Sequence, residues 1–208
     1  MTKTFSLKDI MAMEQRFRAT FINSLGGFKS VLLVGTRSGS GKENLAIFSS
    51  FFHLGANPPL FGLVIRPDVS PRHTLENILE TKSFTLNQIR EDFFEKAHHT
   101  AARYPREISE FDASGLTAHY RPDFFAPAVN ESYIQIGASF KERIDIPLNG
   151  TSIIVGQIEW VHLPEEIIHE DGYVDLVQAG TITCSGLDAY HKAEPIKRLT
   201  YAKPIIKA

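Results

Sequence analysis

Cysteine, charge of one sign and long apolar runs are all scarce in this sequence, and each shortage excludes a class of protein. Cys184 is the single cysteine among 208 residues, so an intrachain disulfide framework or a multi-cysteine metal site is excluded. A reducing, cytoplasmic location is the natural expectation. Basic and acidic side chains nearly cancel, at 22 against 24, which disfavours a nucleic-acid groove. No apolar run approaches the roughly 20 residues that span a bilayer. We expect no nucleic-acid partner and no membrane partner.

Motifs of hydrolases, dinucleotide-binding folds and metal sites are also missing. The sequence contains no GxSxG for a nucleophilic serine and no GxGxxG for a nicotinamide dinucleotide. His98 and His99 are adjacent, so on a helix they point about 100° apart and do not bind one ion in the usual i, i+4 manner. His162 and His169 lie in an acidic stretch that is more typical of a solvated loop than of a metal site. We therefore expect no metal.

One segment, VLLVGTRSGSGKE over residues 31–43, is close to the pattern of a phosphate-binding loop. That pattern requires four residues between its first glycine and the Gly-Lys pair, and from Gly35 there are five. Glu43 stands where a hydroxyl would bind magnesium, and its carboxylate would repel a triphosphate. The glycines therefore favour a hairpin turn between two strands.

Hydrophobic periodicity predicts short strands with helices inserted between them. The predicted helices cover residues 6–25, 70–84 (with Ser70 as a cap and Pro71 in the first turn) and 91–104. The predicted strands cover 30–36, 44–54, 60–66, 84–89, 133–147 and 151–164, with Asn149-Gly150 at the last connection. Residues 176–208 are punctuated by proline and are predicted as a loop-rich tail. The length suits a single domain over 1–208, and the pattern favours a small antiparallel barrel.

Hydroxyl and arginine side chains gather on one pair of neighbouring predicted strands. Ser49 and Ser50 lie beside Phe51 on the first strand, the second strand ends in Arg66, and the start of a helix follows. Hydroxyl and backbone groups on a strand can bind the polar rim of a flat heterocycle, and arginines beside a helix start can hold a phosphate. The alternative is a buried strand followed by an ordinary capped helix whose arginines are solvated. The residues at the helix start are Ser70, Arg72 and Thr74.

These segments resemble the flavin reductase-like FMN-binding proteins, in particular their flavoredoxin-like branch. The pieces that carry the resemblance run in order from about residue 28 to 204: SVLLVGT, NLAIFSSFFHLGANPPLFGLVIRP, RHTLENILETKSFTLN, HHTAARYPREISEFDASGLT, TSIIVGQIEWVHL and GLDAYHK…RLTYAKP. The resemblance implies a six-stranded Greek-key split barrel and a homodimer with FMN near the subunit interface.

The resemblance also implies roles for individual residues. It assigns Asn44, Ser49, Ser50 and Phe51 to the flavin ring, and Arg66, Ser70, Arg72 and Thr74 to the phosphate. Segments that approach the flavin in the family match His99, Thr100, Arg103 and Tyr190.

A flavin supplies the redox chemistry in such proteins, so no protein nucleophile or base is required. The resemblance implies an oxidoreductase that passes electrons from NADH, NADPH or a protein donor through FMN to an acceptor. Flavin reductases of two-component monooxygenases often carry a Gly-Asp-His segment where this chain has Asn149 to Ser152. Direct oxidation of a nicotinamide is therefore left open. A non-catalytic flavin carrier or sensor is the alternative.

Overall fold

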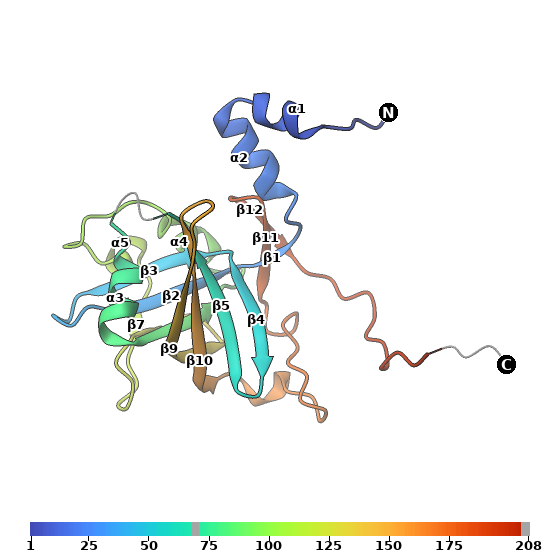
Figure 1. Ribbon diagram of the computed structural model, residues 1–208. Helices are drawn as coiled ribbons and strands as arrows, with labels where there is room; N and C mark the ends of the chain where they lie inside the picture. Colours follow the sequence, from blue (N-terminus) through green and yellow to red (C-terminus); the bar gives the residue numbers. More distant parts are fainter. Residues whose placement is uncertain (68–70, 205–208) are drawn as a thin grey trace.

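A computed structural model of the chain describes residues 1–67 and 71–204. Figure 1 shows a β-barrel with short helices around it, while the first two helices and the last part of the chain extend away from the barrel. The two stretches that extend from the barrel are the beginning and the end of the described sequence.

Seven antiparallel strands form the barrel, which confirms the predicted fold class with one strand more than the six expected. Their order in the sheet is β3-β2-β6-β9-β10-β5-β4. The strands are β2 (Leu32–Arg37), β3 (Glu43–Phe48), β4 (Phe51–Ala56), β5 (Pro59–Ile65), β6 (Ser83–Gln88), β9 (Gln135–Ile146) and β10 (Thr151–His162).

The extra strand arises because the predicted strand over residues 44–54 is interrupted. β3 and β4 are separated only by Ser49 and Ser50, yet they lie at opposite ends of the strand order. The segment pairs with β2 through its first half and with β5 through its second half. A single stretch of chain therefore joins the two ends of the sheet and closes it into a barrel.

Apolar side chains are buried on both faces of β2, which explains its unbroken apolar sequence. Leu32 and Val34 belong to a cluster with Phe61 and Phe84, whereas Val31 and Leu33 belong to a second cluster. Successive side chains of a strand point to opposite faces, so both faces of β2 are covered. The second cluster also contains Leu45, Ile89, Phe93, Phe111 and Ile182.

The turn between β2 and β3 is the predicted hairpin and not a phosphate-binding loop. The strands pair over six positions from Leu32–Phe48 to Arg37–Glu43, and the Ser38 N–H donates to the Lys42 carbonyl at 2.9 Å. Gly41 has a φ of +91°, a conformation that favours glycine.

The helices are shorter than the sequence predicted. They are α1 (Leu7–Ala12), α2 (Gln15–Ser24), α3 (His73–Thr81), α4 (Phe94–His99), α5 (Glu110–Ser114) and the 3-10 turn Glu165–Ile167. The single helix predicted over 6–25 is wrong. It breaks at Met13, whose backbone is extended, and the Glu14 carboxylate caps α2 by accepting the N–H groups of Arg16 and Phe17.

The predicted bounds of the other two helices are also wrong. α3 has its N-cap at Arg72, so Pro71 precedes the helix, and the expected cap Ser70 lies outside the described residues. The helix predicted over 91–104 is reduced to α4. It ends because the Thr100 N–H and hydroxyl both reach back to the Ala97 carbonyl, which replaces helical hydrogen bonds with a tight turn.

The tail predicted as loop-rich contains a β-hairpin. β11 (Ile182–Ser185) and β12 (Ala189–Lys192) pair with each other, and β11 pairs with β1 (Lys29–Ser30). This small sheet brings Lys29 opposite Cys184. A further short pair joins β7 (Ala118–His119) to β8 (Ala128–Val129).

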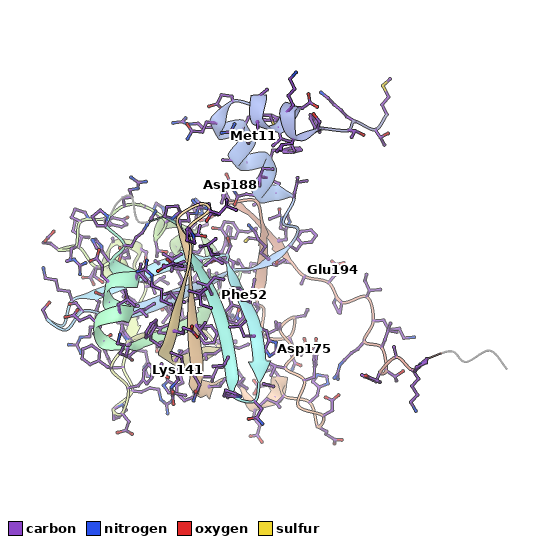
Figure 2. All side chains as sticks on the ribbon, viewed as in Figure 1. Met11, Phe52, Lys141, Asp175, Asp188 and Glu194 are labelled. Atoms are coloured by element: carbon purple, nitrogen blue, oxygen red, sulfur yellow. The ribbon has the colours of Figure 1, made fainter. Side chains whose placement is uncertain are left out.

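The first two helices form an exposed arm. Neither α1 nor α2 has a buried residue, and Leu7, Met11 and Phe17 expose 60% or more of their surface. Figure 2 shows Met11 far from the barrel, where Phe52 and Lys141 lie. Among the described residues, no helix combines the length and the apolar character that crossing a membrane requires.

Candidate functional site

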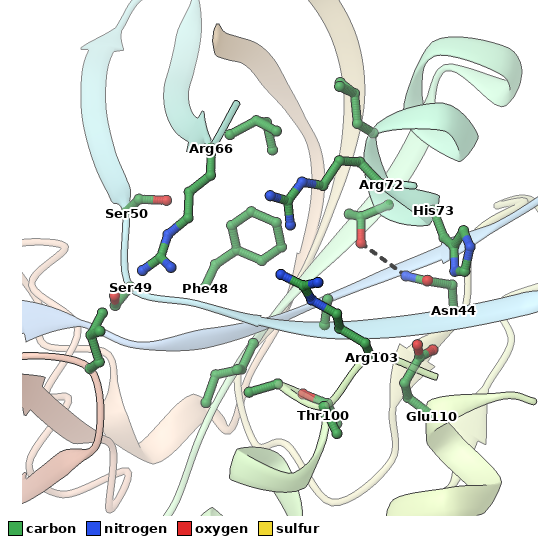
Figure 3. Close-up of a pocket in the computed structure, with 18 of the residues that line it drawn as sticks. Asn44, Phe48, Ser49, Ser50, Arg66, Arg72, His73, Thr100, Arg103 and Glu110 are labelled. Carbon is green, nitrogen blue, oxygen red and sulfur yellow. Dashed lines mark hydrogen bonds between the residues drawn. The ribbon is translucent and has the colours of Figure 1, made fainter. Parts of the chain in front are cut away.

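A cavity of about 1160 Å³ lies where the β3–β4 segment changes partners. One side, which we call the strand wall, consists of the segment 44–50, of which every residue except Leu45 lines the cavity, together with 64–66 and 71–75. The other side, the loop wall, consists of residues 100–107 after α4. Figure 3 shows the two walls facing each other. Nine of the residues predicted from the sequence line this cavity: Asn44, Ser49, Ser50, Arg66, Arg72, Thr74, Thr100, Arg103 and Tyr190.

Hydrogen bonds fix the strand wall on both sides of the cavity. The Asn44 side-chain amide donates to the Thr74 hydroxyl at 2.9 Å, and both side chains are buried. The Ser50 hydroxyl donates to the Val64 carbonyl at 2.9 Å. The first bond joins β3 to the start of α3, and the second joins Ser50, between β3 and β4, to β5. The side chains of this wall are therefore held in defined positions.

The outer edge of β3 offers backbone groups to the cavity. β3 is the last strand of the sheet order, so one of its edges has no neighbouring strand in that sheet. The Leu45 N–H points to this edge, because it donates to the Glu110 carboxylate at 3.0 Å. Backbone groups alternate between the two edges of a strand, so the N–H group of Ile47, two residues further along β3, points the same way. Ile47 lines the cavity.

Three arginine side chains point into the same space. Arg66 and Arg72 come from the strand wall and Arg103 comes from the loop wall (Figure 3). Arg72 Nη2 donates to the Pro67 carbonyl at 3.1 Å, while its Nε is buried with no hydrogen-bond partner among the described residues. Within 1–67 and 71–204, no ion pair involves any of the three guanidinium groups. The arrangement suits an anion.

The cavity is positive although the protein as a whole is slightly negative. Five basic and two acidic side chains line it, an excess of three positive charges, whereas the whole chain carries a formal net charge of −2. The basic residues are Lys29, Arg66, Arg72, Arg103 and Arg106, and the acidic ones are Glu107 and Glu110. A cleft with charge of one sign concentrates ligands of the opposite sign.

Glu110 is a buried carboxyl that the sequence did not reveal. It stands at the start of α5, exposes only 6% of its surface and accepts the Leu45 N–H. Burial raises its pKa above the ordinary value, while that hydrogen bond and the nearby His73 act in the opposite direction. Ser109, a capping residue before an acidic first turn, is the sequence feature that could have indicated this helix.

Tyr190 and Cys184 close the cavity on the side of the small sheet. The Tyr190 hydroxyl lies 2.7 Å from Nδ1 of His98, and burial raises the pKa of Tyr190 to about 12. Cys184 is buried, and burial raises the pKa of its thiol. Neither side chain is ionised near neutral pH, so this side of the cavity adds no negative charge.

Three of the predicted site residues are not placed in the cavity. Phe51 is only partly buried, and its ring packs against Phe61 at 5.5 Å between centroids, as part of the barrel core. His99 is exposed at the end of α4, where its neighbour His98 makes the contact with Tyr190. Ser70 lies outside the described residues. In the described part of the chain, no three His, Cys, Asp or Glu side chains are grouped to hold a metal ion.

Comparison with known proteins identifies relatives across most of the chain. The family described as "Flavin reductase like domain" matches residues 28–177. The chain is 45% identical to a candidate flavin reductase with a split barrel domain from Shewanella frigidimarina NCIMB 400. The crystal structure of that protein is similar at a TM-score of 0.93, over 97% of this chain and 100% of the other.

Two more distant structures share the fold. The flavoredoxin of Desulfovibrio vulgaris (Miyazaki F) is 18% identical with a TM-score of 0.73, covering 84% of this chain and 92% of the other. An FMN-binding protein from Thermus thermophilus is 20% identical with a TM-score of 0.65, covering 85% and 91%. The resemblance to split-barrel flavin reductase-like proteins, flavoredoxins included, is confirmed.

Proposed function

Because this chain belongs to the flavin reductase-like family, we propose that it is an FMN-dependent oxidoreductase whose cofactor occupies the cavity between the strand wall and the loop wall. In this proposal electrons pass from a reduced nicotinamide or a protein donor through FMN to an acceptor. One observation carries the proposal: arginines without ion-pair partners among the described residues converge beside the open edge of a strand.

The chemistry of the residues fits FMN at both of its ends. A phosphate dianion suits Arg66 and Arg72, since guanidinium groups form paired hydrogen bonds with phosphate oxygens. The buried Nε of Arg72, which has no partner among the described residues, would otherwise carry a desolvation cost. The N–H groups on the edge of β3 suit the carbonyl oxygens of a flavin ring. When bound, the flavin supplies the redox chemistry.

The protein's own residues would then bind and orient the cofactor. Arg66, Arg72 and Thr74 would hold the phosphate, with Ser70 from the segment outside the described residues. Asn44, Ser49 and Ser50 would bind the polar rim of the ring. Phe48 and Ile65 line the cavity between these polar groups, so their apolar surfaces would exclude water from the ring.

An absorption spectrum of the purified protein, followed by titration with FMN, tests this function. We expect a yellow protein, or quenching of FMN fluorescence on binding. Arg72→Ala should weaken this binding, whereas Arg121→Ala should not, because Arg121 stacks on Trp160 outside the cavity. A colourless protein that takes up no added FMN would refute the proposal.

A second candidate function is a flavin carrier or sensor without nicotinamide oxidation. It is favoured by the residues that replace the Gly-Asp-His segment: Asn149 and Thr151 bond to each other, and the Ser152 hydroxyl donates to Asp145 at 2.7 Å. Anaerobic mixing of the FMN-loaded protein with NADH or NADPH separates the two. Rapid bleaching supports the reductase, and an unchanged spectrum supports the carrier or a protein donor.

A homodimer and a cytoplasmic location also remain proposals. The exposed apolar side chains of α1 and α2 are compatible with a second copy of the chain packing on the arm. The mass in solution, measured by light scattering, tests the dimer.

A further inference from the structure

We propose that Arg106 is a positioning residue of the FMN site: its guanidinium group ties the loop wall to the start of α3 and holds that wall in place before the cofactor binds. This inference rests on the proposed function, because it concerns how tightly the same cavity retains FMN. The contacts of Arg106, the burial of one of its partners and the exposure of the rest of the loop wall support it.

The Arg106 side chain reaches from the loop wall to two neighbouring residues of α3. Its guanidinium group forms an ion pair with the Glu76 carboxylate, and Nη1 lies 3.5 Å from Oδ1 of Asn77. Asn77 exposes only 1% of its surface, and its side-chain amide donates to the Thr36 hydroxyl at 3.1 Å. A buried acceptor that loses its donor carries a desolvation cost. Arg106 is therefore joined to a fixed part of the core as well as to a surface carboxylate.

Glu76 links this contact to the part of the strand wall that we assign to the phosphate. Oε1 of its carboxylate accepts the Arg72 N–H at 3.2 Å, and Oε2 pairs with Arg106. Arg72 is the N-cap residue of α3, and its own side chain donates to the Pro67 carbonyl. The backbone that carries Arg72 and the loop wall are therefore connected through one carboxylate.

Most of the loop wall before Arg106 is exposed, as Ala101, Ala102 and Arg103 show. Another ion pair of this wall joins Glu107 to Lys42 at 4.0 Å, and exposed pairs of this kind contribute little. A loop that is fixed before its ligand arrives lowers the entropy cost of binding. Loss of the Arg106 contacts should therefore weaken FMN binding, mainly through faster release.

Variants of Glu76 and Arg106 separate this positioning role from a simple effect of charge. Glu76→Gln removes a negative charge beside the phosphate site, which by charge alone would tighten FMN binding, while its amide oxygen can still accept the Arg72 N–H. We expect the opposite. Glu76→Gln and Arg106→Gln should each raise the dissociation constant of FMN roughly fivefold, and Arg106→Lys should lie between Arg106→Gln and the parent. Quenching of FMN fluorescence gives the constants, and stopped-flow dilution gives the release rates.

The matched control is Arg143→Gln. Arg143 pairs with Asp145 on β9 outside the cavity, and its side chain is 35% exposed, as is that of Arg106. This variant should leave FMN binding unchanged. Hydrogen exchange in the FMN-free protein gives a second readout at the Ile108 N–H, which donates to the Pro105 carbonyl at 3.0 Å. We expect roughly fivefold faster exchange there in Arg106→Gln and the parent rate in Arg143→Gln.

FMN binding to Glu76→Gln that is as tight as binding to the parent, or tighter, would overturn the inference, and so would unchanged release from Arg106→Gln. Faster exchange at Ile108 without weaker FMN binding would also overturn it, because the loop wall would then move without consequence for the cofactor. A parent protein that binds no FMN at all refutes the proposed function itself, so the two failures are distinguishable.

Discussion

The two walls of the cavity are built in opposite ways. The strand wall belongs to a ladder in which β3 pairs with β2 at six positions, and Leu45 on it is fully buried. The loop wall follows a six-residue helix, and its residues Ala101, Ala102 and Arg103 are exposed. Strands supported by a core hold side chains in fixed places, whereas surface loops tolerate change. In the proposed function the strand wall would therefore supply the fixed contacts to the cofactor.

The largest expected difference between the walls is in stability. Leu45→Ala should lower the free energy of unfolding by about 2–5 kcal/mol, because it leaves a cavity in the buried cluster shared with Leu33 and Phe111. Arg103→Gln on the loop wall should change it by less than about 0.5 kcal/mol. Urea denaturation followed by circular dichroism measures both. Equal losses of unfolding free energy in the two variants would show that the loop wall is as much a part of the core as the strand wall.

The next largest difference should appear in the affinity for FMN. Arg72→Gln should raise the dissociation constant about 10- to 100-fold, because a hydrogen bond to a charged group contributes about 1.5–3 kcal/mol. Arg103→Gln should have a much smaller effect. Quenching of FMN fluorescence gives the constants, and the urea midpoint of each variant controls for misfolding. If Arg103→Gln is the weaker binder, the assignment of the two walls is reversed.

A smaller effect is expected at the point where the β3–β4 segment changes partners. Ser50→Ala removes the hydrogen bond to the Val64 carbonyl and should cost about 1 kcal/mol of stability. Ser40→Ala, in the exposed turn between β2 and β3, removes only the contact between its exposed hydroxyl and the Ser38 hydroxyl and should cost less than about 0.5 kcal/mol. Chemical denaturation compares the two. A Ser50→Ala variant as stable as the parent would mean that β4 is held to β5 by its ladder alone.

The smallest effect concerns Glu110, which lies on α5 just after the loop wall and accepts the Leu45 N–H of β3. Burial raises its pKa in the folded protein, so the stability it contributes is full below the ordinary value near 4.5 and is lost as pH rises through the raised pKa. Glu110→Gln lacks this titration. The stability of the variant relative to the parent should therefore increase as pH rises from about 4.5, and denaturation at a series of pH values measures it. A difference that does not vary with pH would show that Glu110 titrates normally.

The strand wall was largely predictable from the sequence. Asn44, Ser49 and Ser50 follow a turn marked by glycines, and Arg66 and Arg72 flank a proline-marked connection. Local patterns of this kind determine strands and turns directly. The interruption of the strand at Ser49 and Ser50 was not predictable, because it depends on which neighbours the two halves find.

The secondary structure of the loop wall and of the small sheet was predicted poorly, for physical reasons. Nothing in the apolar pattern of residues 91–104 shows that the Thr100 hydroxyl bonds to the Ala97 carbonyl and ends α4 early. β11 and β12 are only four residues each, too short for a clear alternation, and β11 depends on β1 as a distant partner. The burial of Glu110 follows from tertiary packing that a single sequence does not reveal.

The pairing of Lys29 with Cys184 has a consequence for how the chain folds during its synthesis. β1 leaves the ribosome early, yet β11, the strand on which it pairs, is made 155 residues later. Contacts between segments so far apart in sequence form slowly, since a long loop must close first. The barrel strands from β2 to β10 can assemble in the meantime. β1, which follows the exposed arm, therefore lacks its partner strand until β11 has been translated.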